Sequence, residues 1–184
     1  MYLYPIKEAN KYLETNLNHL LEAGEENQLA NDQFAQFLLQ MDPQEVDQKV
    51  QALNSEIGPK IDCTACGNCC KTLLININEK EADALSKHLD QPREIFDKNY
   101  LEKGMNGALL ISAVPCHFLQ DNKCTVYDFR FEGCKEFPAM HLPHFNKRLF
   151  TTFMHYNRCP IIFNIVEQLK IETQFVLEPK SETL

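Results

Sequence analysis

The 184-residue chain contains no tryptophan, no long apolar run and no excess of basic residues. Its longest apolar stretches, such as 108–111, fall far short of the ~18 residues needed to cross a bilayer. The 18 Lys and Arg against 26 Asp and Glu leave a formal charge of −8. That charge argues against a nucleic-acid binder, because such proteins present a basic face. We therefore expect neither nucleic acid nor a membrane as a partner.

The first 60 residues contain no cysteine and lack the apolar core of a secretory signal at 1–11. They hold 10 acidic and 4 basic residues. Apolar residues recur at helical spacing over 5–23 and 27–41, and Asp42 followed by Pro43 and Glu45 predicts the start of a third helix that ends near 57–59. We expect a cytoplasmic protein whose acidic N-terminal helices offer a docking surface for a protein partner.

The remainder predicts short, mixed elements. Residues 63–70 are too polar and turn-rich for a core element, while Asn78 and Glu81 form a capping box for the next helix. The other expected elements are strands at 73–77, 109–114 and 149–153, a helix from Pro92 to Tyr100, a hairpin at 116–127, a short helix from Asp128 to Glu136, and a helix at 161–170. Gly24 is expected to end the first helix.

These elements predict a mostly helical α+β fold with a small β-hairpin or sheet and a cysteine-rich, metal-bound core. We expect an acidic helical N-terminal region at 1–58, a cysteine-cluster metal-binding domain at 59–175 and a tail at 176–184.

Eight cysteines are the most informative feature of the chain. They are Cys63, Cys66, Cys69, Cys70, Cys116, Cys124, Cys134 and Cys159. Cysteines at every third residue return their thiolates to one side of a turn, and Gly67 allows the backbone to turn tightly between them. Tetrahedral zinc and iron–sulfur clusters both use such sets. The spacing does not separate Zn²⁺ from an iron–sulfur cluster as the cofactor.

Adjacent Cys69 and Cys70 are expected to point apart, so that one completes the first turn and the other faces the second half of the chain. The thiols would then join both halves in one site or two neighbouring sites. Three alternatives remain open: a disulfide scaffold, buried apolar cysteines, and an array that only stores metal.

Four motifs carry a family resemblance. They are Cys-x2-Cys-Gly-x-Cys-Cys at 63–70, Pro115-Cys116-x-Phe118-Leu119, Cys124-x-Val126-Tyr127-x-x-Arg130, and Cys134-x-x-Phe137-Pro138. Over about Cys63 to Pro160 the chain resembles the zinc- or iron-chelating CxxCxxCC domain family of YkgJ-like cysteine-cluster proteins. The resemblance implies that all eight cysteines chelate metal. One departure is Phe131, where the family usually has proline after the arginine.

Other residues are candidates to support the centre. Four thiolates on a dication leave a net charge of about −2, and Arg130 is the residue expected to neutralise it, with Lys135 and Arg158 as lesser candidates. Tyr127 can donate a hydrogen bond to sulfur or to a substrate. His155 and His117 are the histidines best placed in the sequence to act as ligands, because each lies within a few residues of a cysteine.

Three functions remain open from the sequence. The first is a metal-binding module that holds zinc or an iron–sulfur cluster. The second is a metal-dependent enzyme with an open site near Arg130, Tyr127 and His155. One branch of the wider family resembles protein lysine methylases, although no glycine-rich loop after a strand is present here. The third is an adaptor module whose cysteine domain is held together by the metal. The substrate, if there is one, is not indicated.

Overall fold

The computed structural model describes residues 2–3 and 13–179, and these fall into two compact units. The first unit comprises 1–61 and 138–184, and the second comprises 62–137. The C-terminal stretch from Pro138 thus clusters with the N-terminal helices. The sequence domains expected at 1–58, 59–175 and 176–184 remain predictions.

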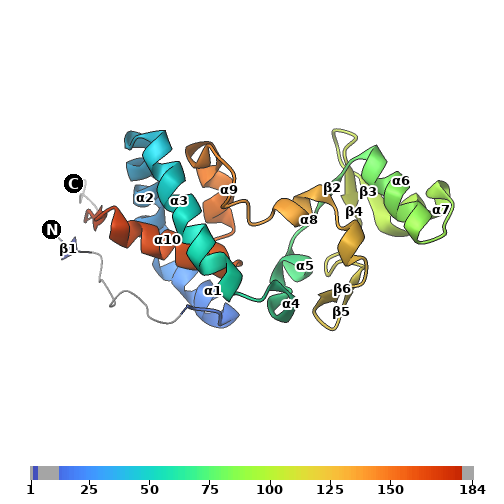
Figure 1. Ribbon diagram of the computed structural model, residues 1–184, viewed down its shortest axis with the longest axis horizontal. Coiled ribbons are helices and arrows are strands. Elements are labelled where there is room, and N and C mark those ends of the chain that lie inside the picture. The colour runs from blue at the N-terminus through green and yellow to red at the C-terminus, as the bar shows by residue number, and fades with distance from the viewer. Residues whose placement is uncertain (1, 4–12, 180–184) are drawn as a thin grey trace, which may run out of the picture. The chain divides into compact units, whose positions relative to one another are not determined.

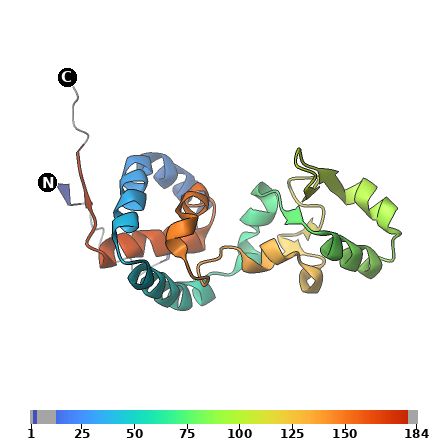
Figure 2. The ribbon, with the colours of Figure 1, turned by 90° about the horizontal axis from the view of Figure 1, so that it is seen from above.

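Unit 1 is almost entirely helical (Figures 1 and 2). Its elements are β1 (Tyr2–Leu3), α1 (Leu17–Glu26), α2 (Gln28–Gln40), α3 (Pro43–Ile57), the 3₁₀ turns η1 (Gly58–Lys60) and η3 (Phe145–Arg148), α9 (Leu149–Met154), α10 (Pro160–Glu172) and β7 (Val176–Leu177), which pairs with β1. Helix α10 packs on α3 and carries eight buried residues. It is therefore the central helix of the unit, and the helix expected at 161–170 is confirmed.

Local signals in the sequence determine the ends of these helices. The side chain of Asp42 accepts hydrogen bonds from the backbone nitrogens of Gln44 and Glu45, and Pro43 occupies the first helical position, as predicted. The carboxylate of Asp47 accepts hydrogen bonds from the nitrogens of His144 (2.6 Å) and Phe145 (2.8 Å) and so fixes η3 against α3.

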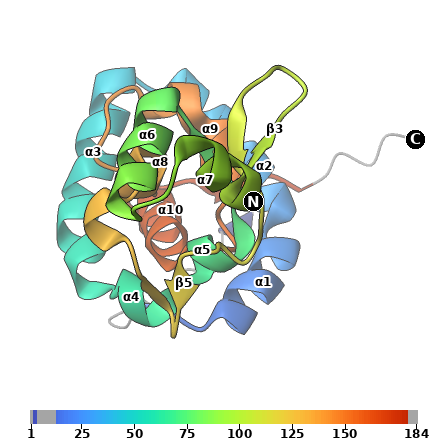
Figure 3. The ribbon, with the colours of Figure 1, turned by 90° about the vertical axis from the view of Figure 1, so that its right-hand side faces the viewer.

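Unit 2 combines short helices with small antiparallel sheets (Figures 1 and 3). Its elements are α4 (Cys63–Cys66), α5 (Asn68–Thr72), β2 (Asn76–Ile77), α6 (Glu79–His88), α7 (Arg93–Tyr100), β3 (Leu101–Lys103), β4 (Leu109–Ile111), β5 (Leu119–Gln120), β6 (Lys123–Cys124), the 3₁₀ turn η2 (Tyr127–Phe129) and α8 (Glu132–Glu136). One sheet has the order β2-β4-β3, and the other is the β5–β6 hairpin. The expected α+β class is confirmed.

The core of unit 2 lies between its sheet and helices α6 and α7. Its buried side chains are Ile77, Ala82, Leu85, Phe96, Leu109, Ile111, Phe118, Val126 and Phe131. Phe131, the departure from the family pattern, is only 4% exposed and belongs to this core. Its apolar ring therefore contributes packing that a proline at this position would not.

Several expectations at this level are wrong. Residues 149–153 form a helix rather than a strand, because Leu149 and Thr152 are buried three residues apart while Phe150 faces solvent. Asp128 lies within η2 rather than starting a helix, and Phe131 occupies the N-cap position of α8. The strands expected at 73–77 and 109–114 are shorter, at 76–77 and 109–111.

The N-terminal helix also differs from expectation. Of the helix expected at 5–23, residues 5–12 lie outside the described residues, and α1 begins only at Leu17. The helix continues through Gly24 to Glu26. A Cβ at Gly24 would lie 2.5 Å from Cβ of Asn157, so this glycine permits a close approach between two parts of unit 1 instead of ending the helix.

Candidate metal centre

Seven of the eight cysteines belong to unit 2, and Cys159 belongs to unit 1. Cys63, Cys66, Cys70, Cys116, Cys124 and Cys134 are free thiols, so no disulfide scaffold is present among these six. In unit 2 the thiols come from three places: the helices α4 and α5, the segment 116–124 that includes the β5–β6 hairpin, and α8.

The motif at 63–70 folds as two short helices rather than the irregular turn expected. Asp62 caps α4, since its side chain accepts hydrogen bonds from the backbone nitrogen (2.8 Å) and the hydroxyl (2.7 Å) of Thr64. Gly67 ends α4 in the left-handed conformation, with φ +58°, and α5 begins at the next residue. This glycine turns the chain between Cys66 and Cys69, as the spacing predicted.

The motif at 63–70 lies against the second cysteine segment. The backbone nitrogen of Cys116 donates to the carbonyl of Cys70 at 2.8 Å. The amide of Asn122, at the tip of the β5–β6 hairpin, donates to the carbonyl of Ala65 at 3.4 Å. A Cβ at Gly67 would lie 3.3 Å from Cβ of Asn122, so the hairpin tip rests on the turn between α4 and α5. Two distant stretches of cysteine-bearing chain therefore converge within unit 2.

The expectation that Cys69 and Cys70 point apart is wrong. Their sulfur atoms lie 4.0 Å from each other. Successive helical residues differ by about 100° around the axis, yet the sulfur atoms of these two neighbours in α5 approach each other. Four sulfurs bound to one tetrahedral zinc at ~2.3 Å are about 3.8 Å apart. The spacing of this pair is thus close to that of two ligands on one ion.

Three cysteines pack on one side against the core. Cys116, Cys124 and Cys134 are half-buried and contact the hydrophobic cluster of unit 2. The helix that carries Cys134 is held by Glu81, whose carboxylate accepts from the backbone nitrogen of Glu132 at 2.6 Å. The other oxygen of Glu81 accepts from the nitrogen of Asn78 at 2.8 Å and completes the predicted capping box of α6. One carboxylate therefore caps two helices.

The electrostatic environment differs among the thiols. A hydrogen bond with Cys69 lowers the pKa of Cys70 to about 6, and the charges of Arg130 and Lys71 act in the same direction. Cys70 therefore has a strong tendency to be a thiolate at neutral pH. Lys71 was not predicted as a supporting residue, although its position directly after the cysteine run is a signal for it.

Desolvation raises the pKa of Cys63, Cys116 and Cys124, and it raises the pKa of Cys134 to about 12. The thiolate of Cys70 contributes to the raised pKa of all four, and Arg130 opposes the effect at Cys63, Cys124 and Cys134. These four thiols therefore lie within the electrostatic influence of Cys70, and three of them within that of Arg130.

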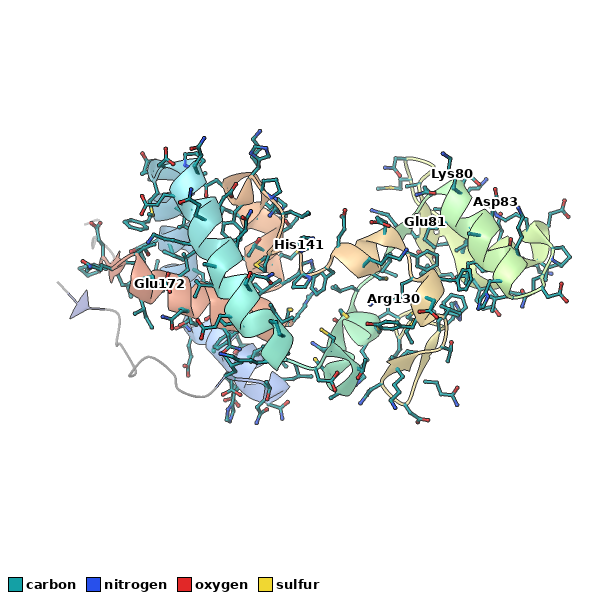
Figure 4. The ribbon with its side chains drawn as sticks, viewed as in Figure 1. Lys80, Glu81, Asp83, Arg130, His141 and Glu172 are labelled. Carbon is teal, nitrogen blue, oxygen red and sulfur yellow. The ribbon has the colours of Figure 1, made fainter. Side chains whose placement is uncertain are left out.

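Arg130 is held in place by Tyr127. Its Nε donates to the carbonyl of Tyr127 at 3.0 Å, and its guanidinium carbon lies 3.6 Å from the centre of the Tyr127 ring. Figure 4 shows Arg130 in unit 2 on the side of α5. Two residues expected to support the centre therefore form one contact pair beside the thiols.

The two histidines predicted as ligands, His117 and His155, lie in different units. His117 is in unit 2, where Nε2 lies 3.0 Å from the hydroxyl of Ser112 and the ring packs edge-on against Tyr100. His155 is in unit 1 at the end of α9, and its carbonyl accepts from the nitrogen of Cys159. Desolvation lowers the pKa of His155, with Arg158 adding to the effect. The structure thus places Cys159, His155 and Arg158 in unit 1 and the other predicted site residues in unit 2.

The donor chemistry fits zinc or iron, because free, partly desolvated thiols beside cationic groups are the usual ligands of both. Among the described residues, however, no group of three or more His, Cys, Asp or Glu side chains is positioned to hold a metal ion. The described side chains therefore do not show the metal-bound core expected from the sequence.

A family model described as "Putative zinc- or iron-chelating domain", CxxCxxCC, matches residues 62–160. The chain belongs to the CxxCxxCC family. The match covers more than half of the 184 residues and includes all eight cysteines of the chain. A search of curated proteins and a search of solved structures each found no match to the chain. In the described part of the CxxCxxCC chain, no helix is both long and apolar enough to span a membrane.

Proposed function

We propose that unit 2 binds zinc or an iron–sulfur cluster through thiolates drawn from Cys63, Cys66, Cys69, Cys70, Cys116, Cys124 and Cys134. The observation that carries the proposal is the convergence of two cysteine segments near Arg130. A hydrogen bond from the backbone nitrogen of Cys116 to the carbonyl of Cys70 joins these segments. Membership of the CxxCxxCC family supports metal as the ligand of these thiols.

In this proposal, different residues of unit 2 have different roles in metal binding. The Cys69–Cys70 pair, with its 4.0 Å sulfur separation, supplies the first two ligands, because the lowered pKa of Cys70 favours its thiolate. Cys116, Cys124 and Cys134 supply further sulfurs from the core side. Arg130 and Lys71 offset the negative charge that thiolate ligation creates. A bound metal would join α5, the hairpin segment and α8 through one centre.

Seven thiols exceed the four that one closed tetrahedral site needs. The surplus fits either a second metal ion or a cluster with thiols beside it. The sequence-based prediction that Cys159 is an eighth ligand, and the alternative of an enzyme with an open coordination position, remain predictions.

The test is metal analysis and absorption spectroscopy of the full chain purified without air. We expect stoichiometric zinc, or iron with inorganic sulfide, and a visible absorption band only in the iron–sulfur case. Cys70→Ser and Cys116→Ser should each lower the metal content, while Thr72→Ser, a conservative change in the same helix as Cys70, should not. A folded, metal-free protein with eight titratable thiols would falsify the proposal.

A further inference from the structure

Unit 1 contains a groove that the metal-binding function does not use. It has a volume of about 1050 Å³ and lies between α1 and α2 on one side and η3, α9 and residues 156–158 on the other. Small-molecule sites are usually cavities of ~300–1,000 Å³ that enclose the ligand. This groove is slightly larger than that range, and its walls come from α1 and α2 on one side and from η3 and α9 on the other.

Contacts between α2 and the segment 146–156 join the two sides of the groove. The ring of Phe34 on α2 meets the ring of Phe153 on α9 edge-on at 6.4 Å, and the amide of Asn146 donates to the carbonyl of Leu38 at 2.9 Å. The hydroxyl of Tyr156 donates to Glu167 at 2.7 Å and accepts from Asn27 at 3.0 Å. The helices on either side are thus fastened to each other beneath the groove, and the groove is part of the fold.

Large apolar side chains of the groove face solvent. Phe150 is 82% exposed, and Leu39 and Met154 are about half exposed. Leu39 comes from α2 and the other two from α9. Exposed apolar side chains that gather in one groove mark a docking site more often than scattered ones do. An amphipathic helix laid into a groove of this kind buries its apolar face against both walls.

The charged side chains that line the groove indicate which charges a bound partner should carry. Between Lys11 and Lys49 the sequence has eight acidic residues and no lysine or arginine. Two of these acids, Glu25 and Asp32, line the α1–α2 wall of the groove. The opposite wall carries Lys147 and Arg158. A helix with basic side chains along the edge that faces α1 and α2 would therefore complement the groove.

We propose that this groove binds an amphipathic α-helix of a partner protein, with its apolar face on Phe150, Met154 and Leu39 and its basic edge toward Glu25 and Asp32. Charge complementarity gives the helix its orientation, and the apolar floor gives it affinity. The site belongs to unit 1 and is independent of the proposed metal centre.

The test uses two 18-residue model peptides and the full chain. Both peptides have the same leucine face and one tryptophan; one carries lysines on the flank and the other carries glutamates. Because the protein has no tryptophan, peptide fluorescence reports binding directly. We expect the lysine peptide to bind at least about tenfold more tightly than the glutamate peptide.

Variants show whether the groove is the binding site. Phe150→Ser should weaken binding of the lysine peptide by about tenfold and Asp32→Lys by about fivefold. Leu74→Ser, at a half-exposed position in unit 2, and Glu56→Lys, which makes the same charge change outside the groove, should stay within about twofold of the unmodified protein. Circular dichroism verifies that each variant is folded.

Three results would overturn the proposal. They are equal binding of both peptides, no binding of either, or equal losses in the groove variants and their controls. Self-association of the protein that rises with concentration and disappears in Phe150→Ser would also overturn it, because a second copy of the chain would then occupy the groove.

Discussion

The guanidinium carbon of Arg130 lies 3.6 Å from the centre of the Tyr127 ring. This contact, with the hydrogen bond to the carbonyl of Tyr127, holds a positive charge beside the thiols of unit 2. Because the ring and the carbonyl of Tyr127 already hold the Arg130 side chain, it loses less conformational freedom on metal binding than an unrestrained lysine side chain would. The positive charge of Arg130 is therefore already in position to offset the negative charge of metal-bound thiolates.

Arg130→Gln should weaken zinc binding by about tenfold, which corresponds to about 1.4 kcal/mol, because the thiolates lose a nearby cation. Competition with a chromophoric chelator measures the affinity. Lys135→Gln removes the same charge from a half-exposed residue that pairs with Glu132 and is the matched control. Equal losses in the two variants would show that only net charge matters.

Glu81→Ala should destabilise the protein by about 2 kcal/mol and also weaken metal binding. The carboxylate of Glu81 caps both α6 and α8, and α8 carries Cys134. Asn78→Ala removes only the cap of α6 and should cost about 1 kcal/mol, with metal affinity unchanged. Urea unfolding and chelator competition measure the two quantities. An unchanged metal affinity in Glu81→Ala would mean that α8 is held by other contacts.

Gly67→Ala should destabilise unit 2 by about 2 kcal/mol or more, because φ is +58° and the added Cβ would press on Asn122. Gly107→Ala has a similar φ of +78° but meets nothing within 4 Å. It should therefore cost about 1 kcal/mol, from the backbone alone. The difference in free energy of unfolding measures the contact between the hairpin tip and the cysteine motif, and equal values would argue that this contact is unimportant.

Lys170 should add to the free energy of unfolding a contribution that rises with pH. This side chain is 1% exposed, and its Nζ donates to Asn31 and Glu167 at 2.7 Å each. Desolvation lowers the pKa of Lys170, although Glu167 opposes the effect. Between that lowered pKa and the ordinary value of about 10.4, Lys170 is protonated more in the unfolded chain than in the folded one, so its contribution to stability increases with pH.

Lys170→Met should remove this part of the slope between pH 7 and pH 10. Lys60→Met, at a position 55% exposed beside Glu56, has the same change in charge and should keep the slope. Urea unfolding at several pH values provides the comparison. Identical slopes in Lys170→Met and Lys60→Met would show that Lys170 does not titrate in this range.

The starts of two helices and one hairpin could be predicted from residues close together in the sequence. Asp42 with Pro43, and Asn78 with Glu81, start α3 and α6 as predicted, because a cap depends on residues within one turn of each other. The hairpin at 116–127 was also predicted, since Asp121 and Asn122 tolerate the positive φ of a tight turn. The strand expected at 149–153 failed because Leu149 and Thr152 pack as a helix on the rest of unit 1, which composition alone does not show.

The sequence by itself determined which chemistry is available. Eight cysteines, their spacing and the motifs around Arg130 point to a metal-chelating domain, because ligand type and short-range spacing are properties of the chain. Only the tertiary structure decided which residues meet. The hydrogen bond from Cys116 to Cys70, the second cap made by Glu81 and the groove around Phe150 depend on packing between distant segments, and such contacts leave no local pattern in the sequence.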